Sequence, residues 1–142
     1  IFRGKTPSNV GTLCRSAYQM GAAGIFTVGK RYPNQASDTV QAFKHIPMRE
    51  FEDMEALLAG LPCSCPIVAV EMGGKPLSNF VHPERACYLL GAEDHGIPAA
   101  VLAKCHYVVS LPSVRIESYN VAVAGSLVMF DRQNKRDAWS KP

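Results

Sequence analysis

A compact polar insert, made of Glu117, Ser118 and Asn120, interrupts the otherwise apolar stretch from Leu111 to Phe130. Carboxylate, hydroxyl and amide groups can hold a ligand through hydrogen bonds. An apolar segment normally reaches the surface through glycine, proline or simple turn residues, so a charged loop here indicates that something binds to it. Asn120 would also be a good N-cap for the helix that follows, and this role is compatible with ligand binding.

Two further polar residues, Asn9 and Arg15, lie on a predicted helix whose buried face does not need them. Apolar residues recur there at i, i+3, i+4, i+7 and i+8, the spacing of one buried stripe: Val10, Leu13, Cys14, Ala17 and Tyr18. Ser8 is the predicted N-cap and Gly21 the predicted C′ residue. At about 100° per residue, Arg15 points roughly opposite the stripe. A surface arginine and a capping asparagine are the alternative interpretations.

The elements that must position these residues predict an α/β fold. The predicted strands are 24–28, 66–71, 86–90 and 106–111, with 1–5 as the remnant of another, and the predicted helices are about 8–20, 38–44, 50–59, 99–104 and 121–135. Strands without strict alternation, separated by helices, favour a mostly parallel sheet with helices on both faces. The 142 residues fit a single domain, 1–142. We expect a trimmed start, because the chain begins at Ile1 without a methionine.

Composition narrows the cellular setting and the partners. Five scattered cysteines fit buried thiols in a reducing cytosol, which predicts a cytoplasmic protein. The closest pair, Cys63 and Cys65, is spaced too tightly for a zinc chelate, so no metal site is expected. The longest apolar segment, 121–130, is about half a membrane span, so no membrane association is expected.

The charge distribution is mildly basic, with a formal net charge of +3. Cations gather in the first part of the chain and at its end, on either side of an acidic block at 50–55: Arg3, Lys5, Arg15, Lys30, Arg31, Arg132, Lys135, Arg136 and Lys141. This pattern is compatible with a polyanionic partner, and equally with ordinary solvated surface charge.

Three segments together resemble the SpoU (TrmH) branch of the SPOUT superfamily, which are knotted RNA methyltransferases that use S-adenosylmethionine. The segments are Asn9-x-Gly-x-x-x-Arg15, Gly91-x-Glu-x-x-Gly96, and Leu111-Pro112 followed by Ser118-x-Asn-Val121. Each lies just beyond a strand, and together they span nearly the whole chain. The chain departs from the family pattern at Ser113, Tyr119 and Ala122, and in a loop one residue shorter.

The resemblance implies methyl transfer to a ribose 2′-hydroxyl of transfer or ribosomal RNA. It also implies a deep trefoil knot in the C-terminal part and a homodimer with a composite active site, in which Asn and Arg of the first helix face the partner's cofactor. The expected catalytic residues are Arg15, Asn9, Glu93, Ser118 and Asn120, and the expected residues that bind S-adenosylmethionine are Val70, Glu71, Gly91, Gly96, Leu111 and Tyr119. Arg15 is expected to grip a phosphate and stabilise the developing alkoxide, since a guanidinium is a poor base. Glu93 is expected to fix Asn9 or Arg15, and is the motif carboxylate that could relay a proton.

Two alternatives belong to other classes. A catalytically silent, knotted RNA-binding or assembly module would have no need to keep Arg15, Glu93, Ser118 and Asn120 together, so their joint presence counts against it. A generic nucleotide-binding α/β enzyme would carry a Gly-x-Gly-x-x-Gly fingerprint or a Walker loop, and the sequence contains neither.

Overall fold

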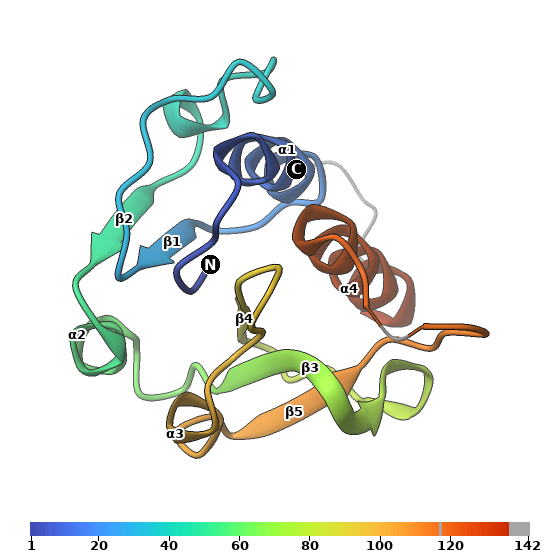
Figure 1. Cartoon of the computed structure of the whole chain (residues 1–142). Helices are drawn as coiled ribbons and strands as arrows, with labels where there is room; N and C mark the ends of the chain where they lie inside the picture. Colours follow the sequence, from blue (N-terminus) through green and yellow to red (C-terminus); the bar gives the residue numbers. More distant parts are fainter. Residues whose placement is uncertain (117, 137–142) are drawn as a thin grey trace.

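A computed structural model of the chain describes residues 1–116 and 118–136. The strands are β1 (Ile25–Val28), β2 (Met48–Phe51), β3 (Ile67–Pro76), β4 (Cys87–Leu90) and β5 (Tyr107–Ser110). The α-helices are α1 (Pro7–Gln19), α2 (Met54–Gly60), α3 (Ala99–Leu102) and α4 (Val121–Arg136), with short 3-10 turns η1 (Ala42–Lys44) and η2 (Leu77–Asn79). Strands and helices alternate along most of the chain (Figure 1).

All the strand pairs are parallel, which confirms the predicted α/β class. β3 is the central strand of three, with β4 on one side and β5 on the other. β1 and β2 form a second parallel pair, in the register Ile25 to Met48. The carboxyl ends of β3, β4 and β5 therefore meet at one edge, where ligands of such sheets usually bind.

The first three residues join the two groups of strands. Phe2 forms a parallel bridge to Val28, and its N–H donates to the Leu90 carbonyl at 2.8 Å. The Arg3 N–H donates to the Val28 carbonyl at 2.9 Å. The strand-like character predicted for 1–5 is confirmed at this bridge, and the resulting order is β2, β1, residues 1–3, β4, β3 and β5.

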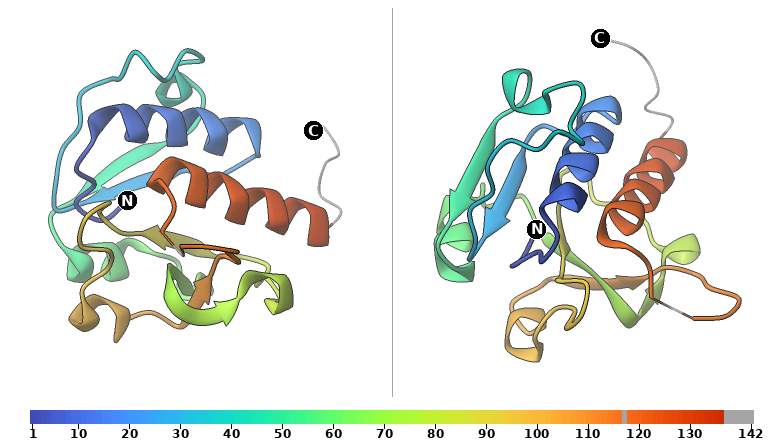
Figure 2. Two further views of the ribbon diagram at one scale, coloured as in Figure 1. Left: turned by 45° about the vertical axis from the view of Figure 1, so that its right-hand side comes forward. Right: turned by 45° about the horizontal axis from the view of Figure 1, so that its top comes forward.

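Helices cover both faces of the sheet, as predicted, and this explains the uninterrupted apolar run of β3. Val68 faces the cluster formed with α1 and α4, whereas Ile67 and Ala69 face the cluster formed with α2 and α3. All three side chains are fully buried. α1 and α4 lie side by side on one face, and α2 and α3 lie on the other (Figures 1 and 2). Gly125 of α4 allows this close packing, because a Cβ there would collide with Leu13 of α1.

Several predicted boundaries are wrong. The helix predicted from residue 50 begins at Met54, because Asp53 is its N-cap and accepts a hydrogen bond from the Ala56 N–H at 2.8 Å. Residues 48–51 instead extend the sheet as β2. α1 begins at Pro7, one residue before the predicted range, and its N-cap is Thr6, not Ser8.

Other elements differ less from the prediction. β3 continues past its predicted end, through an irregularity between Val70 and Lys75, as far as Pro76. The helix predicted over 38–44 is reduced to the 3-10 turn η1. Gly21 follows the end of α1 with φ of 70°, which confirms the predicted C′ residue.

None of the helices in the described ranges is long and apolar enough to cross a membrane.

Candidate active site

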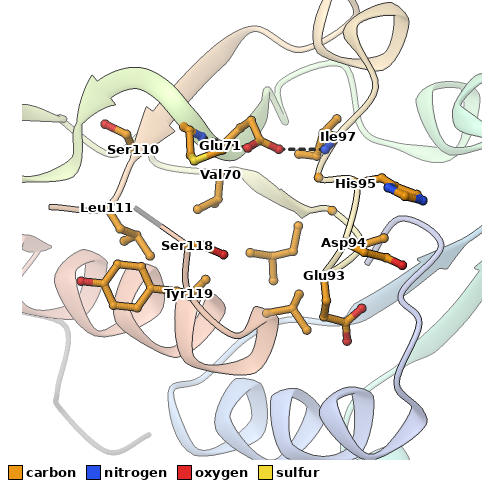
Figure 3. Close-up of a pocket in the computed structure, with 17 residues that line it drawn as sticks. Val70, Glu71, Glu93, Asp94, His95, Ile97, Ser110, Leu111, Ser118 and Tyr119 are labelled. Atoms are coloured by element: carbon orange, nitrogen blue, oxygen red, sulfur yellow. Dashed lines mark hydrogen bonds between the residues drawn. The ribbon is translucent and has the colours of Figure 1, made fainter. Parts of the chain in front are cut away.

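A cavity of about 460 Å³ opens at the carboxyl ends of β3, β4 and β5. The loop 91–97, residues 110–111 and 118–119, and the first turn of α4 line it (Figure 3). Its lining includes all six residues predicted to bind the cofactor and two of those predicted to be catalytic: Val70, Glu71, Gly91, Gly96, Leu111, Tyr119, Glu93 and Ser118. Two of the three motifs, the one that begins at Gly91 and the one that begins at Leu111, therefore contribute to one cavity, whereas residues 9–15 do not line it. The roles of these residues stay predictions.

Gly91 and Gly96 are required by the close approach of the loop to itself and to β3. A Cβ on Gly91 would collide with the backbone of Gly96, and a Cβ on Gly96 would collide with the Glu71 carboxylate. Gly96 also has φ of 59°, which disfavours other residues. The two glycines thus allow the loop to fold tightly against the end of β3.

Glu71 fastens this loop to the sheet. Its Oε2 accepts a hydrogen bond from the Ile97 N–H at 2.7 Å, and its Oε1 accepts one from the Met72 N–H at 2.9 Å (Figure 3). Ile97 itself is buried. Glu71 therefore lies at the cavity wall, as predicted, and it also holds the glycine loop in place.

Glu93 forms the most densely bonded corner of the site. Its Oε1 accepts hydrogen bonds from Asn9 Nδ2 at 2.7 Å and from the Thr6 N–H at 3.3 Å, and its Oε2 accepts one from the Lys5 N–H at 2.8 Å. Partial burial acts to raise the pKa of Glu93, but the hydrogen bonds outweigh it, so the pKa lies below its ordinary value of 4.5. An ionised carboxylate whose two oxygens are both occupied is a rigid acceptor and a poor proton relay.

Asn120 connects the end of the cavity segment to the first helix. Its Oδ1 accepts a hydrogen bond from the Ala122 N–H at 2.9 Å, so it is the N-cap of α4, as predicted. Its Nδ2 donates to Asn9 Oδ1 at 3.1 Å. The chain of bonds from Asn120 through Asn9 to Glu93 joins all three motifs. Only the capping role could be foreseen from the sequence.

Arg15 is not brought into the cavity of its own subunit. It is exposed on α1 and does not line the cavity.

Tyr119, one of the residues that depart from the family pattern, donates a hydrogen bond from its hydroxyl to the Pro112 carbonyl at 2.7 Å. Ser113 Oγ donates to the Ile116 carbonyl at 2.8 Å. Glu117, part of the predicted polar insert, lies outside the described residues.

Sequence reasoning missed several residues of the cavity. Met72, Asp94, His95 and Ser110 also line it. The available signal was the position of Met72 and Ser110 close to the ends of the predicted strands 66–71 and 106–111, and of Asp94 and His95 inside the glycine loop. No group of three or more side chains able to hold a metal ion occurs in the described part of the chain.

Residues 1–130 match the SpoU rRNA Methylase family, and the chain belongs to this family. An uncharacterized tRNA/rRNA methyltransferase of Archaeoglobus fulgidus is 27% identical over 128 residues, which cover 86% of this chain and 57% of the relative. A 23S rRNA (uridine(2479)-2′-O)-methyltransferase of Streptomyces viridochromogenes is 26% identical over 146 residues, covering 94% of this chain and 51% of the relative. The chain thus spans about half the length of these two proteins.

Solved structures share the fold. The SpoU methyltransferase AviRb from Streptomyces viridochromogenes, determined in complex with AdoMet, superimposes with a TM-score of 0.82 at 22% identity, over 96% of this chain and 56% of its own. The observed order of strands and helices is therefore that of a known methyltransferase fold.

Proposed function

We propose that the protein transfers a methyl group from S-adenosylmethionine to a ribose 2′-hydroxyl of transfer or ribosomal RNA. The observation that carries this proposal is a cavity at the carboxyl ends of β3, β4 and β5 that the second and third motifs line, with Asn9 of the first motif hydrogen-bonded to Glu93 at its wall. Membership of the SpoU family supports an RNA methyltransferase, and the 2′-O-methyltransferase among its relatives supports the ribose as acceptor.

The cavity fits S-adenosylmethionine in size and chemistry. About 460 Å³ lies within the usual range for small-molecule sites. Leu90, Leu111 and Val121 provide an apolar lining, and Gly91 leaves backbone groups accessible where a Cβ would not fit. When bound, S-adenosylmethionine supplies an activated methyl group on a sulfonium. Backbone groups of Gly91, Leu111 and Tyr119 hold the adenosine part in this proposal.

The residues of the chain then serve mainly to position the substrate and stabilise charge. Glu93 and Asn120 fix Asn9, which orients the ribose or Arg15. Arg15 grips an RNA phosphate and stabilises the oxygen as the hydroxyl loses its proton. Ser118, at the cavity wall, contributes a hydroxyl next to the reacting ribose.

Because Arg15 lies outside the cavity of its own subunit, we propose a homodimer with a composite site. Val123 and Leu127 form an exposed apolar stripe with Phe130 on α4, with exposures of 47%, 40% and 48%. This stripe borders a shallow apolar groove that includes Thr12 of α1, one turn from Arg15. A second copy seated on the groove brings its own cavity towards Arg15.

The deep trefoil knot is also a proposal. Leu111, just after β5, and Ser118 and Tyr119, just before α4, line the same cavity as the loop 91–97, and Asn120 bonds to Asn9 of α1, so the segment between β5 and α4 begins and ends beside that loop. Threading of this segment through that loop would create the knot. A crystal structure traced continuously from β4 to α4 tests this topology.

Binding and transfer are tested in sequence. Calorimetric titration of the protein with S-adenosylmethionine is expected to show one site per chain, and absence of binding would favour the silent RNA-binding module. Radiolabelled methyl groups transferred to total RNA are expected in dinucleotides that resist alkali, because a methylated 2′-oxygen cannot attack the neighbouring phosphate. Label released in mononucleotides would show that a base, not the ribose, is the acceptor.

A further inference from the structure

Two crossing loops next to the cavity bring four cationic side chains together. They form the basic patch: Arg3, Lys5, Lys30 and Arg31. All four residues are exposed. The loops touch directly, since Lys30 Nζ donates to the carbonyls of Gly4 at 3.2 Å and Lys5 at 3.3 Å. The patch therefore belongs to one fixed surface, although its members are about 25 residues apart in the sequence.

The backbone at Arg3 holds its side chain across the second loop. Arg3 has φ of 46°, uncommon for a residue other than glycine, and its N–H donates to the Val28 carbonyl at 2.9 Å. Gly29 also has a positive φ, and a Cβ there would come within 2.9 Å of Arg3 Nε. Strained backbone conformations of this kind are retained mainly where the position of the residue serves a function.

Apart from Lys5, which pairs with Asp94, the members of the basic patch meet little opposing charge. Among the described residues, neither Arg3 nor Lys30 has an acidic partner within salt-bridge distance. Arg31 pairs with Glu50 at 3.0 Å, but the two side chains are 89% and 46% exposed. Such exposed pairs contribute little and can be displaced by a stronger anion. A phosphate, which an arginine can bind through two parallel hydrogen bonds, is such an anion.

The basic patch is continuous with the wall of the cavity. The Lys5 N–H donates to Glu93 Oε2 at 2.8 Å, and Lys5 Nζ pairs with Asp94 at 2.9 Å. Glu93 and Asp94 both line the cavity, with the N-terminal segment beside them (Figure 3). An RNA strand whose target ribose enters the cavity can therefore continue over this surface.

We infer that the basic patch holds backbone phosphates of the RNA strand that flanks the target nucleotide. This inference rests on the proposed function, because it takes the cavity as the methyl-transfer site. Contacts to phosphates carry no sequence information, so the patch sets affinity and orientation, and the choice of nucleotide is made elsewhere.

Salt dependence of binding tests the inference. The probes are fluorescein-labelled oligouridylate and unfractionated transfer RNA, followed by anisotropy between about 50 and about 200 mM salt. For the triple variant Arg3→Gln, Lys30→Gln and Arg31→Gln we expect weaker binding of both probes. Its slope of log Kd against log salt should be smaller by about 2 for the oligouridylate, since each phosphate contact on a single strand contributes about 0.7.

Arg85→Gln is the matched control. Arg85 is an exposed arginine like Arg31, but it precedes β4 and so lies at the amino ends of the strands, opposite the cavity. We expect its salt slope to equal that of the wild type. If the triple variant loses its folded circular dichroism spectrum, Arg31→Gln alone serves, with an expected decrease in slope of about 0.7.

The outcomes separate this inference from the proposed function. If the wild type binds S-adenosylmethionine, and the patch variants show the same salt slope of RNA binding as Arg85→Gln, the inference about the basic patch is overturned. The proposed methyl-transfer site is unaffected by that result. If the wild type fails to bind S-adenosylmethionine, and the patch variants bind RNA more weakly than the wild type, the proposed function is refuted. The basic patch then remains an RNA-binding surface.

Discussion

Glu93 organises the site as a single charged residue held by its neighbours. Donors from Asn9 and from the backbone of Lys5 and Thr6 fix both carboxylate oxygens, so the loop 91–97 and the start of α1 cannot move independently. A hydrogen bond to an ionised group is stronger than one between neutral groups. We therefore regard Glu93 as a positioning residue that holds Asn9.

The first prediction concerns Gly96. Gly96→Ala should weaken the binding of S-adenosylmethionine by about tenfold or more, or about 1.4 kcal/mol, because the new methyl group collides with the Glu71 carboxylate and displaces the loop. Gly73→Ala is the control, since Gly73 has a similar φ of 76° but open space around its Cβ position. Calorimetry on both variants measures the effect. Equal loss in both would assign it to backbone strain.

The second prediction separates the two roles of Asn120. Asn120→Asp keeps an N-cap oxygen for α4, so its melting temperature should stay near that of the wild type, but it loses the donor to Asn9, so methyl transfer should fall about tenfold or more. Asn120→Ala should lose both, including about 1 kcal/mol of stability. Methyl-transfer turnover and melting temperature, measured in parallel on both variants, distinguish the capping role from the bond to Asn9. Wild-type turnover in Asn120→Asp would show that the bond to Asn9 is dispensable.

At the residue scale the sequence predicts which residues gather, and the family resemblance also predicts that Glu93 fixes Asn9 or Arg15, of which the structure shows the bond to Asn9. The rest of the network could not be predicted. The motif residues could be named because polar groups after buried strands stand out from their surroundings. The bond between Asn9 and Asn120 joins residues 111 positions apart, and nothing in local periodicity encodes such a contact. For Arg15, the position on the helix correctly predicts an exposed side chain. The side chain does not line the cavity of its own subunit.

Among the elements, α4 is anchored at both ends. Asn120 caps its first turn, and a buried polar cluster fixes its second half. In that cluster, His82 lies with its side chain fully buried, with Nδ1 at 2.6 Å from the Tyr88 hydroxyl and Nε2 at 2.8 Å from Asp131 Oδ2. Arg132 donates to the same hydroxyl at 3.1 Å, and Lys135 pairs with Asp131 at 2.8 Å.

This cluster is satisfied by a neutral His82. The Tyr88 hydroxyl, which accepts from Arg132, can donate to His82 Nδ1, and His82 Nε2–H can donate to Asp131. A second proton on the ring would sit on Nδ1 and point at the Tyr88 hydroxyl. The Tyr88 O–H would then lose Nδ1 as its hydrogen-bond acceptor. Burial lowers the pKa of His82 below its ordinary value of 6.5, although the bond to Asp131 acts in the opposite direction.

The third prediction follows from the direction of this pKa shift. Because folded His82 binds a proton more weakly than unfolded His82, the free energy of unfolding should be highest above pH 6.5 and should decrease as the pH falls through 6.5 towards the lowered pKa. Urea titrations between about pH 7 and about pH 5 measure this. His82→Gln should flatten that part of the profile. A profile unaltered by His82→Gln would contradict the assignment.

At the element scale, sequence patterns located every helix longer than one turn but missed β2. The four residues of β2 are mostly exposed, with one bulky side chain turned inward, so they carry no apolar run. Their strand conformation comes from pairing with β1, a tertiary contact. The N-cap Asp53 was the local signal that the helix begins only after them.

For the whole molecule, the proposed dimer makes the fourth prediction. Arg15→Ala and Gly96→Ala damage different parts of one composite site, so each variant alone should have about a tenth of wild-type activity or less when S-adenosylmethionine is well below saturation. Mixed and refolded together, they should recover about a quarter of wild-type activity, since about half of the dimers contain both chains and each of these has one intact site. Methyl transfer by the mixture measures this recovery. No recovery, with dimers confirmed by light scattering, would place Arg15 and the cavity in the same subunit.

The three residues that bridge the sheet have a consequence for how the molecule opens. Backbone bonds from Phe2 and Arg3 link β1 to β4, which do not pair with each other directly. Cooperative unfolding units usually follow such connections. We therefore expect amide hydrogens of β1 and β4 to exchange with the same opening free energy. The exchange is measured by NMR. If the amides of β1 exchange with a lower opening free energy than those of β4, the part of the molecule with β1, β2 and α2 unfolds locally while the part that forms the cavity stays folded.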